Sequence, residues 1–169
     1  MDLIKHEKTN HLSEKSFSKI SEHLSRLAEK LNISAVILVN SAGQIIAHHT
    51  TPMWKADTLS ISVLSASTYS AANEMAKLIS EENNFLMVLH EGSKQSILTS
   101  AVSRDYFLVV VFPKGTALGL VRLFAKKTAG NLKDIVIKSE QPARKEQADL
   151  GEHFQALLSK ELDRAFGEF

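Results

Sequence analysis

The chain has 169 residues, 44% hydrophobic and 23% charged, which is enough to bury one core and typical of a single globular domain. Twenty Lys and Arg residues against nineteen Asp and Glu residues give no electrostatic reason to expect nucleic acid or an acidic membrane as partner. Cysteine is absent, which excludes disulfides, thiolate metal sites and a cysteine nucleophile. The polar N-terminus lacks a signal-peptide pattern and no apolar run reaches membrane-spanning length, so we expect a cytoplasmic protein.

The first part of the chain is predicted to be a tail followed by a helix. Residues 1–15 are polar and mixed, which favours a flexible tail. An apolar stripe at helical spacing begins at Phe17, and Asn32 is the expected stop. The stripe consists of Phe17, Ile20, Leu24, Leu27, Ala28 and Leu31.

A β-hairpin is predicted next. Residues Ser34–Asn40 are rich in β-branched and aliphatic side chains, as a buried strand requires. Gly43 can adopt the positive φ that a tight turn needs. The chain is then expected to return as a second strand over Gln44–Thr50.

A long helix is predicted from Asp57, a suitable N-cap, to an end near Asn83 and Asn84. One face carries mostly larger residues and is expected to pack on the domain's own sheet: Ile61, Leu64, Thr68, Ala71, Met75, Leu78 and Ile79. The opposite face is nearly uncharged and mostly small, which favours close approach by a partner: Leu59, Ser62, Val63, Ala66, Ser67 and Ser70. The alternative is a Ser/Ala-rich helix that is merely tolerated at the surface.

Three further strands and a helix are predicted after the long helix. The strands cover Phe85–Glu91, Gln95–Val102 and Tyr106–Phe112, and the third is apolar enough to be the sheet centre. Thr116 can cap the following helix. Hairpin and meander together predict an α+β fold with a five-stranded antiparallel sheet sandwiched by helices. Before Glu91, the strand Phe85–Glu91 lacks the charged side chains that usually prevent an edge strand from pairing with another chain. At the edge of the sheet it would favour a symmetric dimer through Phe85, Leu86, Met87, Val88 and Leu89.

The C-terminal part is predicted to be an exposed polar linker over residues 138–148 and an appended amphipathic helix over 149–169. The domain itself is expected over residues 16–137. The appended helix must dock its apolar stripe somewhere: on its own domain, on a second copy or on a partner. The stripe consists of Leu150, Phe154, Leu157, Leu158, Leu162 and Phe166.

Motifs for catalysis, cofactors or metals are not found in the sequence. His48 and His49 would point to opposite faces of a strand and cannot chelate one metal together. The chain contains no GxSxG elbow, no HExxH and no P-loop, and the acidic residues do not form a convergent pair. We therefore expect a protein that is not itself an enzyme and that holds no cofactor or metal. A ligand-sensing module of the PAS or GAF type would need a roomy pocket, whereas the sheet faces are expected to be filled by helices.

The succession of segments resembles the roadblock (dynein light chain) domain family, and within it the MglB-type regulators of bacterial gliding motility. The resemblance covers roughly Phe17 to Ile137, and the C-terminal amphipathic helix also matches the tail of these relatives. The segments that carry it most specifically are HEGSKQSI (His90 to Ile97), VVVF (Val109 to Phe112) and LGLVRL (Leu118 to Leu123).

This resemblance implies a homodimer whose paired long helices form a platform for a Ras-like small GTPase of the MglA type. Relatives of this kind are GTPase-activating proteins that work in cell polarity and motility, two subunits to one GTPase. They supply no arginine finger and rearrange the catalytic residues of the GTPase instead. By position, the platform would be the small face Leu59, Ser62, Val63, Ala66, Ser67 and Ser70. The tail helix from Leu150 to Phe166 would contact the GTPase away from its nucleotide.

Two alternatives remain open from the sequence. Arg104, on the turn before the last strand, is the arginine best placed for an arginine finger supplied in trans, although a plain turn residue is the simpler interpretation. The protein could also be a dimeric roadblock scaffold that binds a GTPase or another partner without stimulating hydrolysis.

Overall fold

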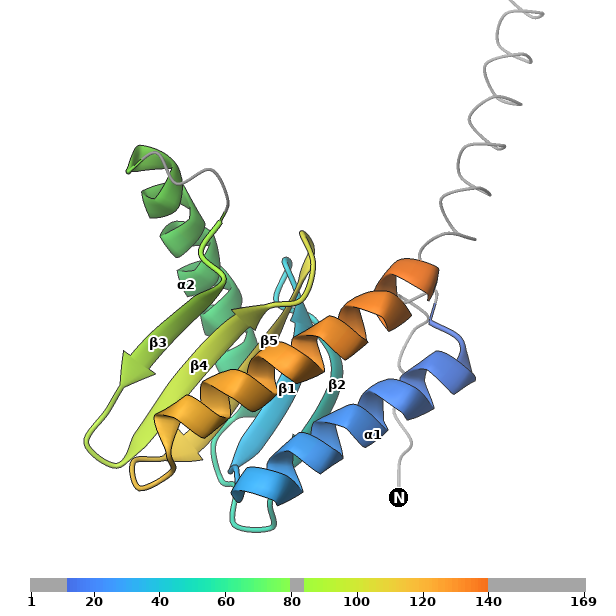
Figure 1. Ribbon diagram of the computed structural model, residues 1–169, viewed down its shortest axis with the longest axis horizontal. Helices are drawn as coiled ribbons and strands as arrows, with labels where there is room; N and C mark the ends of the chain where they lie inside the picture. Colours follow the sequence, from blue (N-terminus) through green and yellow to red (C-terminus); the bar gives the residue numbers. More distant parts are fainter. Residues whose placement is uncertain (1–11, 80–83, 140–169) are drawn as a thin grey trace, which may run out of the picture.

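The computed structural model describes residues 12–79 and 84–139. An antiparallel five-stranded sheet, in the order β2-β1-β5-β4-β3, lies between two helical layers (Figure 1). This confirms the predicted α+β sandwich. The elements are α1 (Glu14–Leu31), β1 (Ala35–Asn40), β2 (Ile45–Thr50), α2 (Thr58–Leu78), β3 (Met87–Glu91), β4 (Gln95–Ala101), β5 (Tyr106–Pro113) and a third helix over residues 118–139.

The sheet centre is β5, as its apolar sequence predicts. It pairs with β1 on one side, where Ala35 lies opposite Val111, and with β4 on the other, where Leu98 lies opposite Val110. Every residue from Phe107 to Phe112 is buried because helices cover both faces. The edges are β2 and β3, so β3 has the exposed position on which the dimer prediction depends.

One face of the sheet is covered by α1 and the third helix, which lie side by side across it (Figure 1). Alternate residues of β1 and β5, among them Leu38 and Val110, point into this layer because side chains along a strand alternate between faces. The two helices pack against these strand residues with apolar side chains at helical spacing. Their buried members include Ile20, Leu24, Leu27, Val121, Ala125, Leu132 and Val136.

The other face is covered by α2, and the prediction of which side of α2 contacts the sheet is wrong for most of its residues, although Ile61 packs on the sheet as predicted. The buried side is the small one, where Ser62 is 0% and Ala66 5% exposed, and Tyr69 is its one large member. Leu64 and Leu78, predicted to pack on the sheet, are 63% and 83% exposed. Small residues allow α2 to approach the sheet closely, so Ala66 and Tyr69 pack against Ile37, Val109 and neighbouring residues.

Helix ends follow the capping chemistry of the sequence. Ser13 accepts a hydrogen bond from the Ser16 N–H and starts α1 three residues before the predicted position. Asn32 ends it in the left-handed conformation, at φ 50°. Asp57 caps α2, and hydrogen bonding, chiefly from the Ser60 hydroxyl, lowers the pKa of its carboxyl.

Some predicted boundaries differ from the observed ones. Helix α2 ends at Leu78, before the asparagines proposed as its stop, and β3 begins at Met87 rather than Phe85. Residues 138 and 139, predicted to belong to a linker, are helical. The predicted tail residues 1–11 and the C-terminal helix at 149–169 lie outside the described part of the chain.

Candidate functional site

The exposed side of α2 is an apolar surface that is uncharged over most of its length. Residues 58–73 contain no charged side chain, although α2 is an outer layer of the domain. Leu59, at the first turn, is 58% exposed. Uncharged apolar area of this kind on an outer helix marks a contact surface for another molecule. This α2 exposed face comprises Leu59, Val63, Leu64, Ser67, Ser70, Met75 and Leu78.

Close contacts with the rest of the domain fix the orientation of α2. The turn residue Gly43, at φ 81°, lies so near α2 that an added Cβ would be 3.0 Å from the Val63 Cα. The buried Ser62 hydroxyl donates to the Thr58 carbonyl at 2.8 Å, so this polar group is satisfied within the helix. Rotating α2 would bring larger residues into the layer between the helix and the sheet, where Ser62 and Ala66 lie buried.

The predicted platform is therefore only partly on the surface. Leu59, Val63, Ser67 and Ser70 are exposed, as a platform requires. Ser62 and Ala66 are buried against the chain's own sheet, so they cannot contact a partner without moving α2. The large residues Leu64, Met75 and Leu78 take their place on the exposed side, which sequence reasoning missed because it assigned large residues to the core.

The free edge of β3 lies next to the end of α2. The Tyr69 hydroxyl donates to the Phe85 carbonyl at 2.6 Å and ties α2 to the segment entering the strand. The Ala101 N–H donates to the Leu86 carbonyl and the Gly92 N–H to the Gln95 carbonyl. Because bonding alternates in antiparallel pairs, the N–H and C=O groups of Met87, Leu89 and Glu91 face the free edge.

The predicted edge residues lie at or beside this edge. Met87, Val88 and Leu89 belong to β3, whereas Phe85 and Leu86 precede it. Leu86 is well exposed, and Leu89 is partly exposed. The edge and the α2 exposed face thus offer apolar surface and unpaired backbone groups side by side, which suits β-strand addition by another chain.

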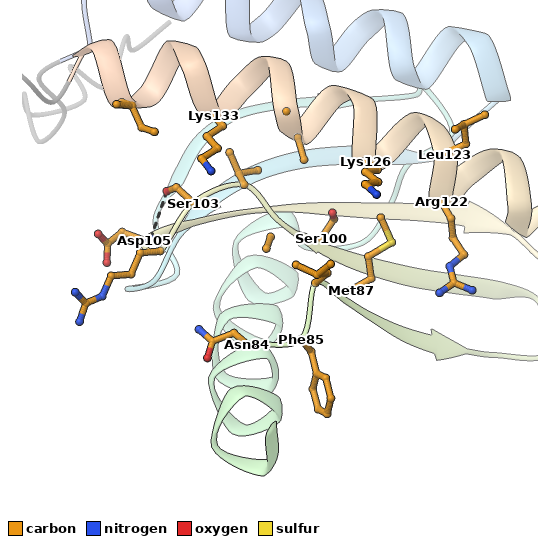
Figure 2. A pocket seen from close by; sticks show the side chains of 17 residues that line it. Asn84, Phe85, Met87, Ser100, Ser103, Asp105, Arg122, Leu123, Lys126 and Lys133 are labelled. Carbon is orange, nitrogen blue, oxygen red and sulfur yellow. Dashed lines mark hydrogen bonds between the residues drawn. The ribbon is translucent and has the colours of Figure 1, made fainter. Parts of the chain in front are cut away.

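A groove runs between the third helix and the β3–β4 side of the sheet, on the face opposite α2 (Figure 2). Its volume is about 1390 Å³. Figure 2 shows Arg122, Lys126 and Lys133 extending from the helix toward the strands that carry Met87 and Ser100. The sequence analysis missed this groove, although the cations recur at helical spacing (i, i+4, i+11), which could have indicated a basic stripe.

Side chains that could bind a metal or take part in catalysis are spread over the described ranges 12–79 and 84–139. No three His, Cys, Asp or Glu side chains there come together to hold a metal. His49 Nδ1 lies 3.1 Å from the Ser25 hydroxyl on the α1 side, and His48 faces the opposite side, as predicted. Arg104 is exposed on the β4–β5 turn and lines the groove of the third helix. None of the helices in the described ranges has the length and apolarity to cross a bilayer.

Comparison with known proteins decides the family. The Roadblock/LC7 domain matches residues 19–112, more than half of the chain. This chain belongs to the Roadblock/LC7 domain family. The match begins in α1 and ends in β5, so it contains α2 and all five strands of the sheet. The third helix and its groove follow the matched region.

Solved roadblock structures include proteins similar to this chain. Myxococcus xanthus MglB is 37% identical, with 76% of this chain and 95% of that chain covered and a TM-score of 0.70. The gliding protein MglB from Thermus thermophilus is 22% identical, covers 78% of this chain and 98% of its own length, and gives a TM-score of 0.71, which supports the fold. A curated relative from Aquifex aeolicus (strain VF5), described as an uncharacterized protein, is 25% identical over 99% of this chain and 98% of its own.

Proposed function

We propose that this roadblock protein is a cytoplasmic, homodimeric regulator of an MglA-type Ras-like small GTPase, with a role in cell polarity or gliding motility. In this proposal it acts as a GTPase-activating protein without an arginine finger. The observation that carries the proposal is the apolar α2 exposed face, which is uncharged over residues 58–73. The 37% identity to Myxococcus xanthus MglB supports it further.

Dimerisation would bring two α2 helices together. Pairing of two β3 edges through the outward groups of Met87 and Leu89 continues the sheet across a two-fold axis. Tyr69 ties α2 to the segment entering β3, so the two helices would be carried close to the same axis. Part of the exposed apolar area then packs between subunits, and the remainder forms a platform for the GTPase.

The proposed mechanism needs no catalytic group from this chain. A GTPase switch loop alternates between arrangements, and a partner that binds the hydrolytic arrangement more tightly increases its population. A flat surface of serine and aliphatic side chains can make such contacts at close range. Ser67 and Ser70 lie on this surface beside Val63 and Leu64.

The direct test measures phosphate release by a purified MglA-type GTPase with and without the roadblock protein. Ser67→Arg places a long cation in the centre of the α2 exposed face and is expected to abolish stimulation. Ser18→Arg, the same change at an exposed position of α1, is the matched control and should stimulate like the unmodified protein. Equal stimulation by both variants would exclude the α2 exposed face as the platform.

Two further measurements separate the alternatives. Arg104→Ala should leave the hydrolysis rate unchanged, whereas a loss approaching the ~10³-fold contribution of an arginine finger would assign catalysis to Arg104. A GTPase that is retained on the immobilised protein but hydrolyses at its basal rate would contradict the activating role and identify a scaffold.

A further inference from the structure

The groove of the third helix has an apolar floor and a cationic rim. Leu123 and Ile137, near its two ends, are exposed in part, and Met87, Ala101 and Val102 belong to the strand side. A groove that combines exposed apolar residues with charges on one side suits an amphipathic segment of opposite charge.

The rim cations lack ion-pair partners in the part of the chain that the structure describes. The two ion pairs found there join Arg26 to Glu22 and Lys77 to Glu74, both away from the groove. Arg122, Lys126 and Lys133 extend into the groove from the third helix. Arg104, on the β4–β5 turn, also lines it. Four cations and one carboxylate, that of Asp105, thus line one groove of a chain whose net charge is only +1, so the groove itself keeps an excess of positive charge. Their shared occupant would be acidic.

We infer that the C-terminal segment of the same chain, residues 149–169, docks in this groove. The segment carries five acidic and two basic side chains, and its apolar stripe is the one identified from Leu150 to Phe166. Glu161 lies four residues after Leu157, and Glu168 seven after Glu161, so helical spacing places both within or beside that stripe. Acidic groups there disfavour a purely apolar site but match a groove whose rim is basic.

The position of the chain makes this docking possible without strain. Ile137 lines the groove, and the described part of the chain ends two residues later at Ser139. The nine residues from 140 to 148 can span up to about 30 Å when extended. From Arg122 to Lys133 the groove wall is about 16 Å long at the helical rise. The segment can therefore turn back and lie along the helix that precedes it.

The inference is independent of the proposed GTPase partner, because it concerns contacts within one chain. It predicts that the roadblock domain covers its own C-terminal stripe until something displaces it. It also assigns the rim cations a role in holding this segment.

Cross-linking in the full chain tests the inference, and the absence of cysteine allows two to be introduced alone. Gly130→Cys lies in the groove, where an added Cβ meets nothing within 4 Å, and it is combined with Leu158→Cys in the segment. A short bismaleimide should yield a cross-linked monomer, identified by mass spectrometry of the joined peptides. Ser18→Cys with Leu158→Cys, the control at an exposed position of α1, should give little product.

Charge reversal gives the second readout. Glu161→Lys with Glu168→Lys should lower the yield of cross-linked monomer roughly fivefold, a change expected for two partly exposed ion pairs. Adding Lys126→Glu and Lys133→Glu should restore it. Equal yields at Gly130 and Ser18, or no effect of either charge change, would overturn the inference. Product only as a covalent dimer would also overturn it and assign the groove to the segment of a second copy.

Discussion

The Tyr69 hydroxyl donates a 2.6 Å hydrogen bond to the Phe85 carbonyl, and the Tyr69 ring stacks on Phe107 with centroids 5.3 Å apart. Tyr69→Phe keeps the ring contact and removes only the hydrogen bond. We expect it to lower the free energy of unfolding by about 1 kcal/mol, the usual net value of one such bond. Urea denaturation measures this loss. Hydrogen exchange should also accelerate at the start of β3, and unchanged exchange there would contradict the role of Tyr69 as a tie.

The same residue predicts a dependence on alkaline pH. Burial raises the pKa of the Tyr69 phenol above its ordinary value, so the folded state binds this proton more tightly than the unfolded state. The stabilisation is complete below about pH 10, the ordinary tyrosine pKa, and is lost as pH rises through the folded value. Unfolding free energies from pH 8 to 11 should fall more steeply for the unmodified protein than for Tyr69→Phe. Parallel curves would argue against the raised pKa.

Two neighbouring positions on α2 should respond differently to the same substitution. Ala66→Arg forces a charged side chain into the layer between α2 and the sheet and is expected to cost about 3 kcal/mol or more. Ser67→Arg, on the exposed side, should change the free energy of unfolding by less than about 0.5 kcal/mol. Thermal unfolding followed by circular dichroism compares the two. Equal losses would mean that α2 is oriented otherwise.

Substituting alanine for Gly43 and for Gly130 should change the free energy of unfolding in opposite directions. Gly43 has φ 81° and an added Cβ would approach the Val63 backbone at 3.0 Å, so Gly43→Ala should destabilise by about 1–3 kcal/mol. Gly130 is helical with open space around it, so Gly130→Ala should stabilise by about 0.5–1 kcal/mol. Denaturant midpoints of both variants provide the comparison. A stable Gly43→Ala variant would show that the turn can relax away from α2.

The edge of β3 can be tested with proline. The Leu89 N–H faces outward, so Leu89→Pro removes a group needed by an added strand while sparing the bonds to β4. We expect the variant to be monomeric by sedimentation velocity and to retain its circular dichroism spectrum. Leu89→Ala shortens the side chain but keeps the N–H, and is expected to remain dimeric. A dimeric Leu89→Pro protein would place the subunit contact elsewhere.

Most of the fold could be predicted because it depends on local signals. The apolar run from Tyr106 to Phe112 indicates a central strand, and Asn32 and Asp57 occupy cap positions where their side chains favour helix ends. Gly43 stands where the hairpin turn needs positive φ. Each of these features acts within a few residues, so one sequence is enough to recognise it.

The site was harder to predict because large apolar side chains are usually the buried ones, whereas on α2 mostly small side chains are buried and several large ones are exposed. Ala66 and Ser62 are buried because the helix lies close to the sheet, and Leu64 and Leu78 are exposed because they lie on the side of the helix that faces away from it. The spacing of hydrophobic residues shows that a helix has an apolar side, but it does not show whether that side faces the core of the domain or another molecule. The groove was missed because only the tertiary fold brings Arg104 to the same groove as Lys126 and Lys133.

The pairing of β1 with β5 has a consequence for how the protein is made. Ala35 of β1 can pair with Val111 of the central strand β5 only after 76 further residues have been added (111 − 35 = 76). A nascent chain that has emerged as far as β4 holds a hairpin and a second pair of strands with nothing to join them. Closing so distant a contact is entropically costly and slow. The ribosome must therefore finish nearly the whole domain before its centre can form, and the last strand completes the sheet from within.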